Sequence, residues 1–152
     1  MKISIGIDPG KSGGVSVIWD KGGVLSIPYD DMEFIELIQS IDIYSASENI
    51  PVVCCVEKVG AMPGQGVTSM FNFGKSAGFI EGVLQALSIP YQLIPPRKWK
   101  KEYSLNSDKQ KSIEVCKKLF PGVSLRRTDR CTTDHDGMAE SLLMAEYARR
   151  NL

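Results

Sequence analysis

Apolar and polar residues alternate along the first thirty residues in a way that predicts three short strands. The strands cover residues 3–7, 15–19 and 24–28, and the segments between them are short and contain glycine. Short links of this kind join neighbouring antiparallel strands. The start of the chain is therefore expected to form an antiparallel meander.

The remaining residues alternate between helix-like and strand-like patterns. Residues 50–56 form an unbroken apolar run, typical of a strand buried on both faces, and residues 91–94 predict a short strand that ends at Pro95. Apolar residues at helical spacing predict helices over residues 31–41, 68–87, 107–120 and 134–149. This order predicts an α/β protein with a mixed five-stranded sheet, an antiparallel meander followed by parallel strands, flanked by helices.

Three glycines share one face of the helix predicted over 68–87. Gly74, Gly78 and Gly82 repeat every four residues. Each glycine costs about 1 kcal/mol in a helix interior, so this face is expected to lie close to another backbone. Two neighbours are open, the sheet or a partner helix in a dimer.

Composition indicates a single domain over residues 1–152, in the range of ordinary soluble proteins. No apolar run reaches the roughly 20 residues of a membrane span, and no signal-peptide pattern is present, so a cytoplasmic location is expected. The four cysteines show no CxxC spacing and are expected to be free thiols. Cys54 and Cys55 are adjacent in a strand and should face opposite sides of the sheet.

Charge is unevenly distributed, although the formal net charge is zero. Between Lys21 and Lys58 there are seven acids and no Lys or Arg, whereas the segment from Arg97 to Arg130 holds eleven bases and four acids. Such asymmetry predicts a face that meets a polyanion. A solvated helix surface of mixed charge would have the same composition.

Acidic residues stand at three points where buried segments end or begin. Asp8 ends the first strand, and Glu57 follows the strand over 50–56. Asp136 and Glu140 lie four residues apart on the last helix and therefore share one face. If the first and fourth strands are neighbours, their carboxyl ends meet where α/β proteins place ligands. A helix that begins beside them would complete a cluster of four carboxylates.

Such a cluster requires cations, because two like charges about 4 Å apart repel by roughly 4 kcal/mol at an effective dielectric constant of about 20. Oxygen-only ligands select Mg²⁺ or Mn²⁺ over zinc. Two such ions can activate water and stabilise the leaving oxygen of a phosphodiester. The sequence therefore predicts metal-assisted hydrolysis of a nucleic-acid backbone, with catalytic and metal-binding residues Asp8, Glu57, Asp136 and Glu140.

Each acid also has a structural interpretation. Asp8 before Pro-Gly suits a turn, Glu57 suits an exposed strand end, and Asp136 suits the first turn of a helix, where the dipole favours an acid. For the N-cap of the last helix, Asp134 or Thr133 is expected. The only histidine, His135, suits the surface or a position beside the acids that orients water or phosphate.

Five ordered segments resemble the RuvC-type Holliday junction resolvases, above all the small members encoded by bacteriophages. The segments are GIDPGKSGG, VEK followed by MPGQG, FNFGKSAGFIEGVL, PPRKWKK and DHDGMAESLLMAEYA. The resemblance implies an RNase H-like fold, a homodimer, Mg²⁺ dependence and paired symmetric nicks across a four-way DNA junction. It places the protein in the cytoplasm of a bacterial cell or an infected host.

The resemblance assigns the four acidic family positions to Asp8, Glu57, Asp136 and Glu140. Bacterial members usually place the last two acids three residues apart, whereas here the spacing is four. Asp134 therefore competes with Asp136 for the third position, and Asp134 and His135 are candidate accessory residues.

Residues near the acids are expected to contact DNA under this resemblance. They are Lys58, Gln65, Thr68, Lys75, Arg97, Lys98, Lys100 and Lys101. Trp99 has two interpretations, a ring that stacks on bases or a core anchor after the two prolines. The helix that carries the three glycines is the candidate for part of the dimer interface.

Other functions are compatible with the sequence. A related nuclease would cut flaps or RNA–DNA hybrids, and a junction-binding protein would have lost catalysis. GIDPGKSGG also resembles the first phosphate loop of actin-type and sugar-kinase-type phosphotransferases. Those proteins need two such domains around a nucleotide, and this chain has room for one, so no nucleotide cofactor is expected.

Overall fold

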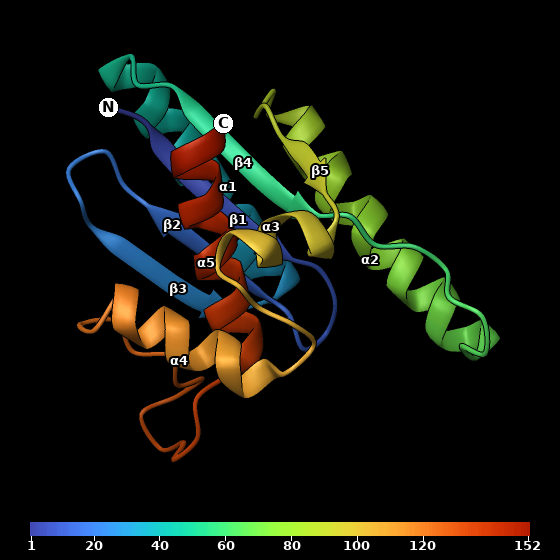
Figure 1. The fold of residues 1–152 in the computed structure, drawn as a ribbon. Coiled ribbons are helices and arrows are strands. Elements are labelled where there is room, and N and C mark those ends of the chain that lie inside the picture. Colours follow the sequence, from blue (N-terminus) through green and yellow to red (C-terminus); the bar gives the residue numbers. More distant parts are fainter.

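The computed structural model describes residues 1–152 and contains a five-stranded sheet with helices on both faces (Figure 1). The strands are β1 (Ile3–Asp8), β2 (Gly14–Ile18), β3 (Val24–Pro28), β4 (Val52–Glu57) and β5 (Gln92–Ile94). The helices are α1 (Asp31–Glu48), α2 (Val67–Ala86), α3 (Pro96–Glu102), α4 (Lys109–Leu119) and α5 (Asp136–Asn151). None of the helices combines the length and apolar character that a membrane crossing requires.

The strands lie in the order β3-β2-β1-β4-β5. β1, β2 and β3 pair antiparallel, as the predicted meander requires, whereas β4 pairs parallel with both β1 and β5. The predicted mixed sheet is confirmed. The parallel pairing of β1 with β4 brings the ends of these two strands to the same edge.

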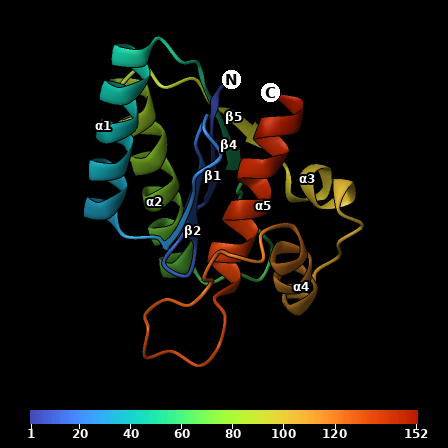
Figure 2. The same ribbon diagram turned by 90° about the vertical axis from the view of Figure 1, so that its left-hand side faces the viewer.

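The sheet separates two hydrophobic cores. Figure 2 shows α1 and α2 on one face and α3, α4 and α5 on the other. Alternate residues of β1, such as Ile5 and Ile7, pack with Phe34 of α1 and the other residues of the α1–α2 core. Cys54 belongs to this core, whereas Cys55 belongs to the core beneath α5. The predictions of opposite faces and of free thiols are confirmed.

Helix α5 lies directly on the backbone of the sheet. A methyl group added at Gly6 would collide with backbone atoms of Ser141 and Ala145. One added at Gly14 would collide with the backbone of Gly137, the second residue of α5. Because these three glycines lack side chains, the first half of α5 lies against β1 and β2. Its acidic residues are thereby held close to the sheet edge.

Two segments differ from the sequence prediction. α3 was not predicted, because the two prolines indicated only the end of a strand. Pro96 is in fact the first residue of α3, a position where its missing N–H and fixed φ suit a helix. α1 continues to Glu48, beyond the predicted end at residue 41, and ends at Asn49 in the left-handed conformation.

The glycine face of α2 has no neighbour within the chain. A methyl group at Gly74, Gly78 or Gly82 would meet no atom within 4 Å. The sheet interpretation of this face is therefore wrong, since α2 packs on the sheet through Ile80 and Leu84 instead. Figure 1 shows the first half of α2 projecting beyond the sheet.

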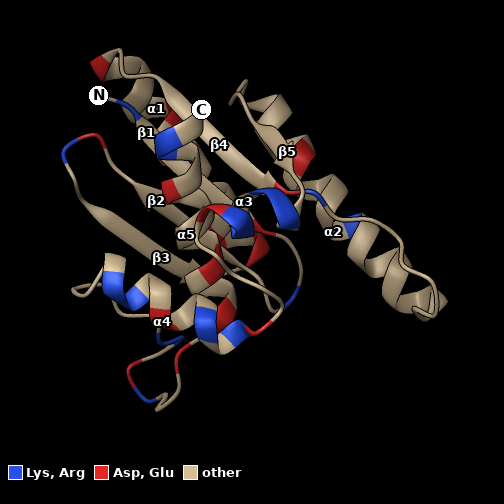
Figure 3. Ribbon diagram, in the orientation of Figure 1, with Lys and Arg blue, Asp and Glu red and all other residues tan.

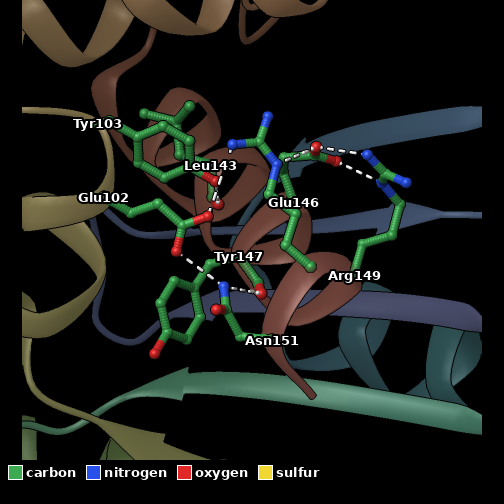
Figure 4. A network of polar contacts seen from close by, with 8 residues as sticks. Glu102, Tyr103, Leu143, Glu146, Tyr147, Arg149 and Asn151 are labelled. Atoms are coloured by element: carbon green, nitrogen blue, oxygen red, sulfur yellow. Dashed lines mark hydrogen bonds and ion pairs between the residues drawn. The ribbon is translucent and has the colours of Figure 1, made fainter.

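Polar contacts attach α3 to α5 (Figure 4). The Tyr103 hydroxyl donates to the Leu143 carbonyl at 2.8 Å, and the Asn151 amide donates to Glu102 at 2.7 Å. The buried Glu146 carboxylate accepts from its neighbours on α5, Arg149 and Arg150. These contacts join the end of α3 to the second half of α5.

Candidate active site at the ends of β1 and β4

The structure brings the four predicted acids to one end of the sheet. Ile7 of β1 pairs with Val56 of β4, so the next residue of each strand, Asp8 and Glu57, stands at the same edge. Asp136 begins α5 and Glu140 follows one turn later, at the end of the helix that lies over β1 and β2. The strand pairing and the docking of α5 thus produce the predicted convergence.

Asp8 is the most strongly perturbed of these acids. Burial raises its pKa well above the ordinary value, and the negative charges of Glu57 and Glu140 raise it further. The positive charge of Lys109 lowers it, and the charge of Asp136 raises it slightly. All four acids are therefore close enough to interact electrostatically around Asp8.

Glu57 is held by a tryptophan. Burial raises the pKa of Glu57, whereas a 2.9 Å hydrogen bond donated by Trp99 Nε1 to Glu57 Oε2 lowers it, and the net direction is upward. The Trp99 ring is fully buried. The interpretation of Trp99 as a core anchor is confirmed, and the stacking role is wrong because the ring has no exposed face.

Glu140 is 5% exposed and has two partners. Ser112 Oγ donates to Glu140 Oε1 at 3.2 Å, and Lys100 Nζ lies 3.5 Å from the same oxygen. Both partners come from the helices that flank α5, since Lys100 belongs to α3 and Ser112 to α4. They give the buried carboxylate one neutral donor and one positive charge.

Asp136 forms an ion pair with Lys109, whose Nζ lies 2.6 Å from Asp136 Oδ2. Burial alone would raise the pKa of Asp136, but the hydrogen bond and charge of Lys109 outweigh it and hold the pKa below its usual value. Lys109 is the first residue of α4. Two lysines, Lys100 and Lys109, thus provide counter-charges for Glu140 and Asp136 in the first half of α5.

The four carboxylates are ligands of the kind that a hard divalent cation prefers. All four side chains offer carboxylate oxygens, and Asp8 is destabilised as an anion by burial and by like charges, which a bound cation would relieve. The side chains as placed do not bring three of the acids into a common coordination geometry. Asp136 and Glu140 point to lysines instead. A cation bound by these two acids would compete with both lysines for the carboxylate oxygens.

The beginning of α5 differs from the prediction. His135 is the N-cap, and its Nδ1 accepts from the Met138 N–H at 3.1 Å. The expected caps, Asp134 and Thr133, are wrong, because Asp134 instead pairs with Lys117 at 3.0 Å. The charge of Asp136, by contrast, raises the pKa of Asp8. This supports Asp136 as the third acid of the set.

The predicted DNA contacts fall into two exposed groups. Lys58, Gln65, Thr68 and Lys75 are exposed along the segment that leaves β4 and the first half of α2. Arg97, Lys98 and Lys101 are exposed on α3, where Figure 3 shows basic residues beside the acids of α5. Lys100 differs from its neighbours, since it is half-buried and turned toward Glu140.

Sequence reasoning missed three side chains that contact the acids. Trp99 was not linked to Glu57, nor Ser112 to Glu140, because both contacts join segments far apart in the chain. The contact of Lys109, by contrast, could have been predicted from its position in the sequence. A lysine at the first position of a helix that has no acid in its first turn opposes the helix dipole, which indicates an acidic partner from outside the helix.

Solved structures share this architecture. Thermus thermophilus RuvC in complex with a Holliday junction substrate has a TM-score of 0.57 and 15% identity, covering 99% of this chain and 97% of that one. A second Thermus thermophilus RuvC structure has a TM-score of 0.52 and 18% identity, covering 97% and 96%. The chain has the RuvC-type, RNase H-like fold. The yeast mitochondrial Holliday junction resolvase gives a TM-score of 0.49 and 17% identity, covering 96% and 77%. No model of a protein family matches the sequence, and no curated protein matches it.

Proposed function

We propose that this protein is a divalent-metal-dependent endonuclease that resolves Holliday junctions and other branched DNA by paired symmetric nicks. The observation that carries this proposal is Asp8, a half-buried carboxylate at the end of a RuvC-type sheet, whose pKa is raised by desolvation and by the charges of Glu57 and Glu140. A perturbed carboxylate among other carboxylates marks a site that is built to act on a ligand rather than to stabilise the fold. The RuvC structures of the same fold support DNA junctions as the substrate class.

Each acid has a distinct role in this proposal. Asp8, at the centre of the set, would hold the divalent metal together with Glu57 and Asp136, and Glu140 would complete the set. Mg²⁺, or Mn²⁺ in its place, would supply the activated water and stabilise the leaving oxygen when bound. Trp99 holds the Glu57 carboxylate in one orientation, and Ser112 does the same for Glu140.

Lys100 and Lys109 serve as counter-charges for the acids of α5 when no ion is bound. With Asp136 and Glu140 engaged by cations, both ammonium groups would be free to meet a phosphate oxygen. Lys100 is held against the Trp99 ring, with Nζ 5.4 Å from the ring centroid, so it remains near the site.

The decisive experiment uses a labelled synthetic four-way junction with Mg²⁺ or with EDTA. The parent protein is expected to make paired nicks only with the metal. Asp8→Asn is expected to bind the junction without cutting it. Glu48→Gln, which alters an exposed acid at the far end of α1, should cut like the parent. Cutting by Asp8→Asn, or cutting in EDTA, would contradict the proposal.

A homodimer would supply the two-fold symmetry that paired nicks require. The exposed glycine face of α2 continues into two exposed apolar side chains, Val67 at 86% and Phe71 at 71%. We assign this face to the dimer interface. Gly78→Leu is expected to convert the protein to a monomer in sedimentation, whereas Ala46→Leu on exposed α1 should not. An unchanged mass for Gly78→Leu would exclude this face.

One observation favours a second candidate, a junction-binding protein without catalysis. Lys100 and Lys109 already provide counter-charges, so the acids can persist without metal. Junction binding without nicks, in Mg²⁺ and in Mn²⁺, would select this candidate. Nicking of an RNA–DNA hybrid in preference to a junction would instead identify a related nuclease.

A further inference from the structure

A polar cleft lies beside the candidate active site, on the α1 and α2 side of the sheet. It is formed by the turn between β1 and β2, the start of α1, the first half of α2 and the loop between α4 and α5. Gly10, in its wall, is only two residues beyond Asp8. Figure 2 shows the loop between α4 and α5 extending beyond the end of the sheet. The cleft has two positively charged side chains. Lys11 comes from the turn between β1 and β2, and Arg127 comes from the loop between α4 and α5.

Five polar side chains that line this cleft have no side-chain partner in the chain. Lys11 and Arg127 form no ion pair, unlike Lys100 and Lys109, which pair with acids of α5, and Lys117, which pairs with Asp134. The polar side chains that α2 contributes to the cleft form no side-chain hydrogen bond, and they are Ser69, Asn72 and Ser76. Two positive groups and three neutral polar groups are thus available to a ligand.

The acids of the cleft are, by contrast, already engaged. Asp30 caps α1, and its Oδ1 accepts from the N–H groups of Met32 and Glu33 at 3.0 Å each. Asp31 Oδ1 accepts from the Tyr29 hydroxyl at 2.7 Å. Burial and this hydrogen bond raise the pKa of Tyr29, so the hydroxyl stays protonated and keeps Asp31 occupied. The groups left free in the cleft are mainly donors, which suit the oxygens of a phosphate.

The cleft and the basic surface of α3 lie on opposite sides of Asp8, where a nucleic-acid strand could contact both. The basic surface of α3 lies on the α5 side of the sheet, whereas the cleft lies on the α1 and α2 side. A nucleic-acid strand that crosses the sheet edge at Asp8 must continue to both sides. The α3 surface is available on one side, and the cleft is available on the other.

We propose that this cleft binds the sugar–phosphate backbone of the DNA strand that passes over Asp8, on the side away from α3. Lys11 and Arg127 contact phosphate, and Asn72 and the two serines donate to phosphate or sugar oxygens. The two cations are matched by two acids, so the cleft selects one segment of backbone by geometry and does not attract polyanions in general. This inference rests on the proposed function.

The first test measures the affinity for an uncut four-way junction over a range of salt concentrations, in the Asp8→Asn background with EDTA. Lys11→Ala and Arg127→Ala are each expected to weaken binding about five- to tenfold at about 0.1 M salt and to reduce the slope of log K against log[salt] by about 1. Lys11→Arg should retain the parent behaviour. Lys21→Ala removes the same charge from the turn between β2 and β3, at the other end of β2, and should change neither quantity.

A second test fills the cleft without changing charge. Ser69 is exposed in the first turn of α2, so Ser69→Trp should fold, and its thermal midpoint checks this. It is expected to weaken junction binding severalfold while the salt slope stays unchanged. Ser47→Trp, at an exposed position near the end of α1, is the matched control and should bind like the parent.

The two proposals fail in different ways. If the Asp8→Asn protein binds no junction at low salt, the proposed function is wrong and the inference falls with it. If it binds the junction but the three cleft variants match the Lys21→Ala and Ser47→Trp controls, the cleft proposal is overturned and the proposed function stands.

Discussion

The indole of Trp99 donates a 2.9 Å hydrogen bond to Glu57 and thereby links the short helix α3 to the end of β4. The ring is fully buried, so it anchors α3 in the core while its one polar atom reaches the candidate active site. α3 is in turn attached to α5 through Tyr103 and Asn151. The orientation of Glu57 therefore depends on packing that lies well outside the site.

Trp99→Phe should keep most of the packing and remove the donor to Glu57. Because that hydrogen bond lowers the pKa of Glu57, its loss raises the pKa further, and the acid side of the pH–rate profile should move to higher pH. The free energy of unfolding should fall by about 1–3 kcal/mol. Junction nicking across pH and urea unfolding test this. Trp19→Phe, on the far side of the sheet, should leave the pH profile unchanged, and an unmoved profile for Trp99→Phe would contradict the role.

Asp8→Asn should stabilise the protein at neutral pH in EDTA. The pKa of Asp8 is raised in the folded state, so the unfolded chain loses this proton first and the free energy of unfolding falls as pH rises above about 4. Removing the charge should add roughly 0.5–2 kcal/mol at neutral pH. Urea unfolding should show the gain at neutral pH and none below about pH 4. A gain of equal size at both pH values would point to a packing effect instead.

Lys109→Met should affect the site more than the fold. The Lys109 side chain is 64% exposed, so loss of its ion pair with Asp136 should change the free energy of unfolding by at most about 1 kcal/mol. Its charge lowers the pKa of Asp8, Glu57 and Asp136, so all three rise in the variant.

Nicking by Lys109→Met should therefore fall more at pH 6 than at pH 8 relative to the parent. Lys111→Met removes an exposed charge from the same helix and is the control. A loss of the same size at every pH would mean that Lys109 acts only by contacting the substrate.

Gly6→Ala should disrupt the docking of α5. The added methyl group would overlap backbone atoms of Ser141 and Ala145, which cannot rotate away, so destabilisation of about 3 kcal/mol is expected. Gly122→Ala adds the same methyl group to an open position in the turn after α4 and should change the free energy of unfolding by less than about 0.5 kcal/mol. Urea unfolding compares the two. Equal stabilities would show that α5 does not lie on the sheet as described.

The strands and most helices were predictable because each carries a local pattern. Isoleucine at every second position of β1 reflects the face that packs against α1 and α2, while Gly6 lies beneath α5, and the apolar run of β4 reflects two buried faces. α3 was not predictable in this way, because seven residues are too few to show helical periodicity and prolines suggest an end. The cap of α5 was mistaken because histidine is not a usual capping residue, although its Nδ1 accepts as an oxygen would.

The candidate site was predictable in its acids but not in their partners. Asp8 and Glu57 could be brought together by strand adjacency alone, because both end strands of a predicted sheet. The contacts of Lys109 and Ser112 depend on how α4 packs against α5, and nothing in the local sequence encodes that packing. The position of Asp136 relative to Asp134 likewise required the observed start of α5.

The division of the core by the sheet gives the protein two built-in chemical reporters. Cys54 and Cys55 are neighbours in β4, yet each thiol is sealed by a different helical layer. A thiol reagent reaches Cys54 only when the α1–α2 layer opens, and reaches Cys55 only when the layer of α3, α4 and α5 opens. The ratio of their labelling rates in the folded protein therefore tells whether the two layers open together or separately.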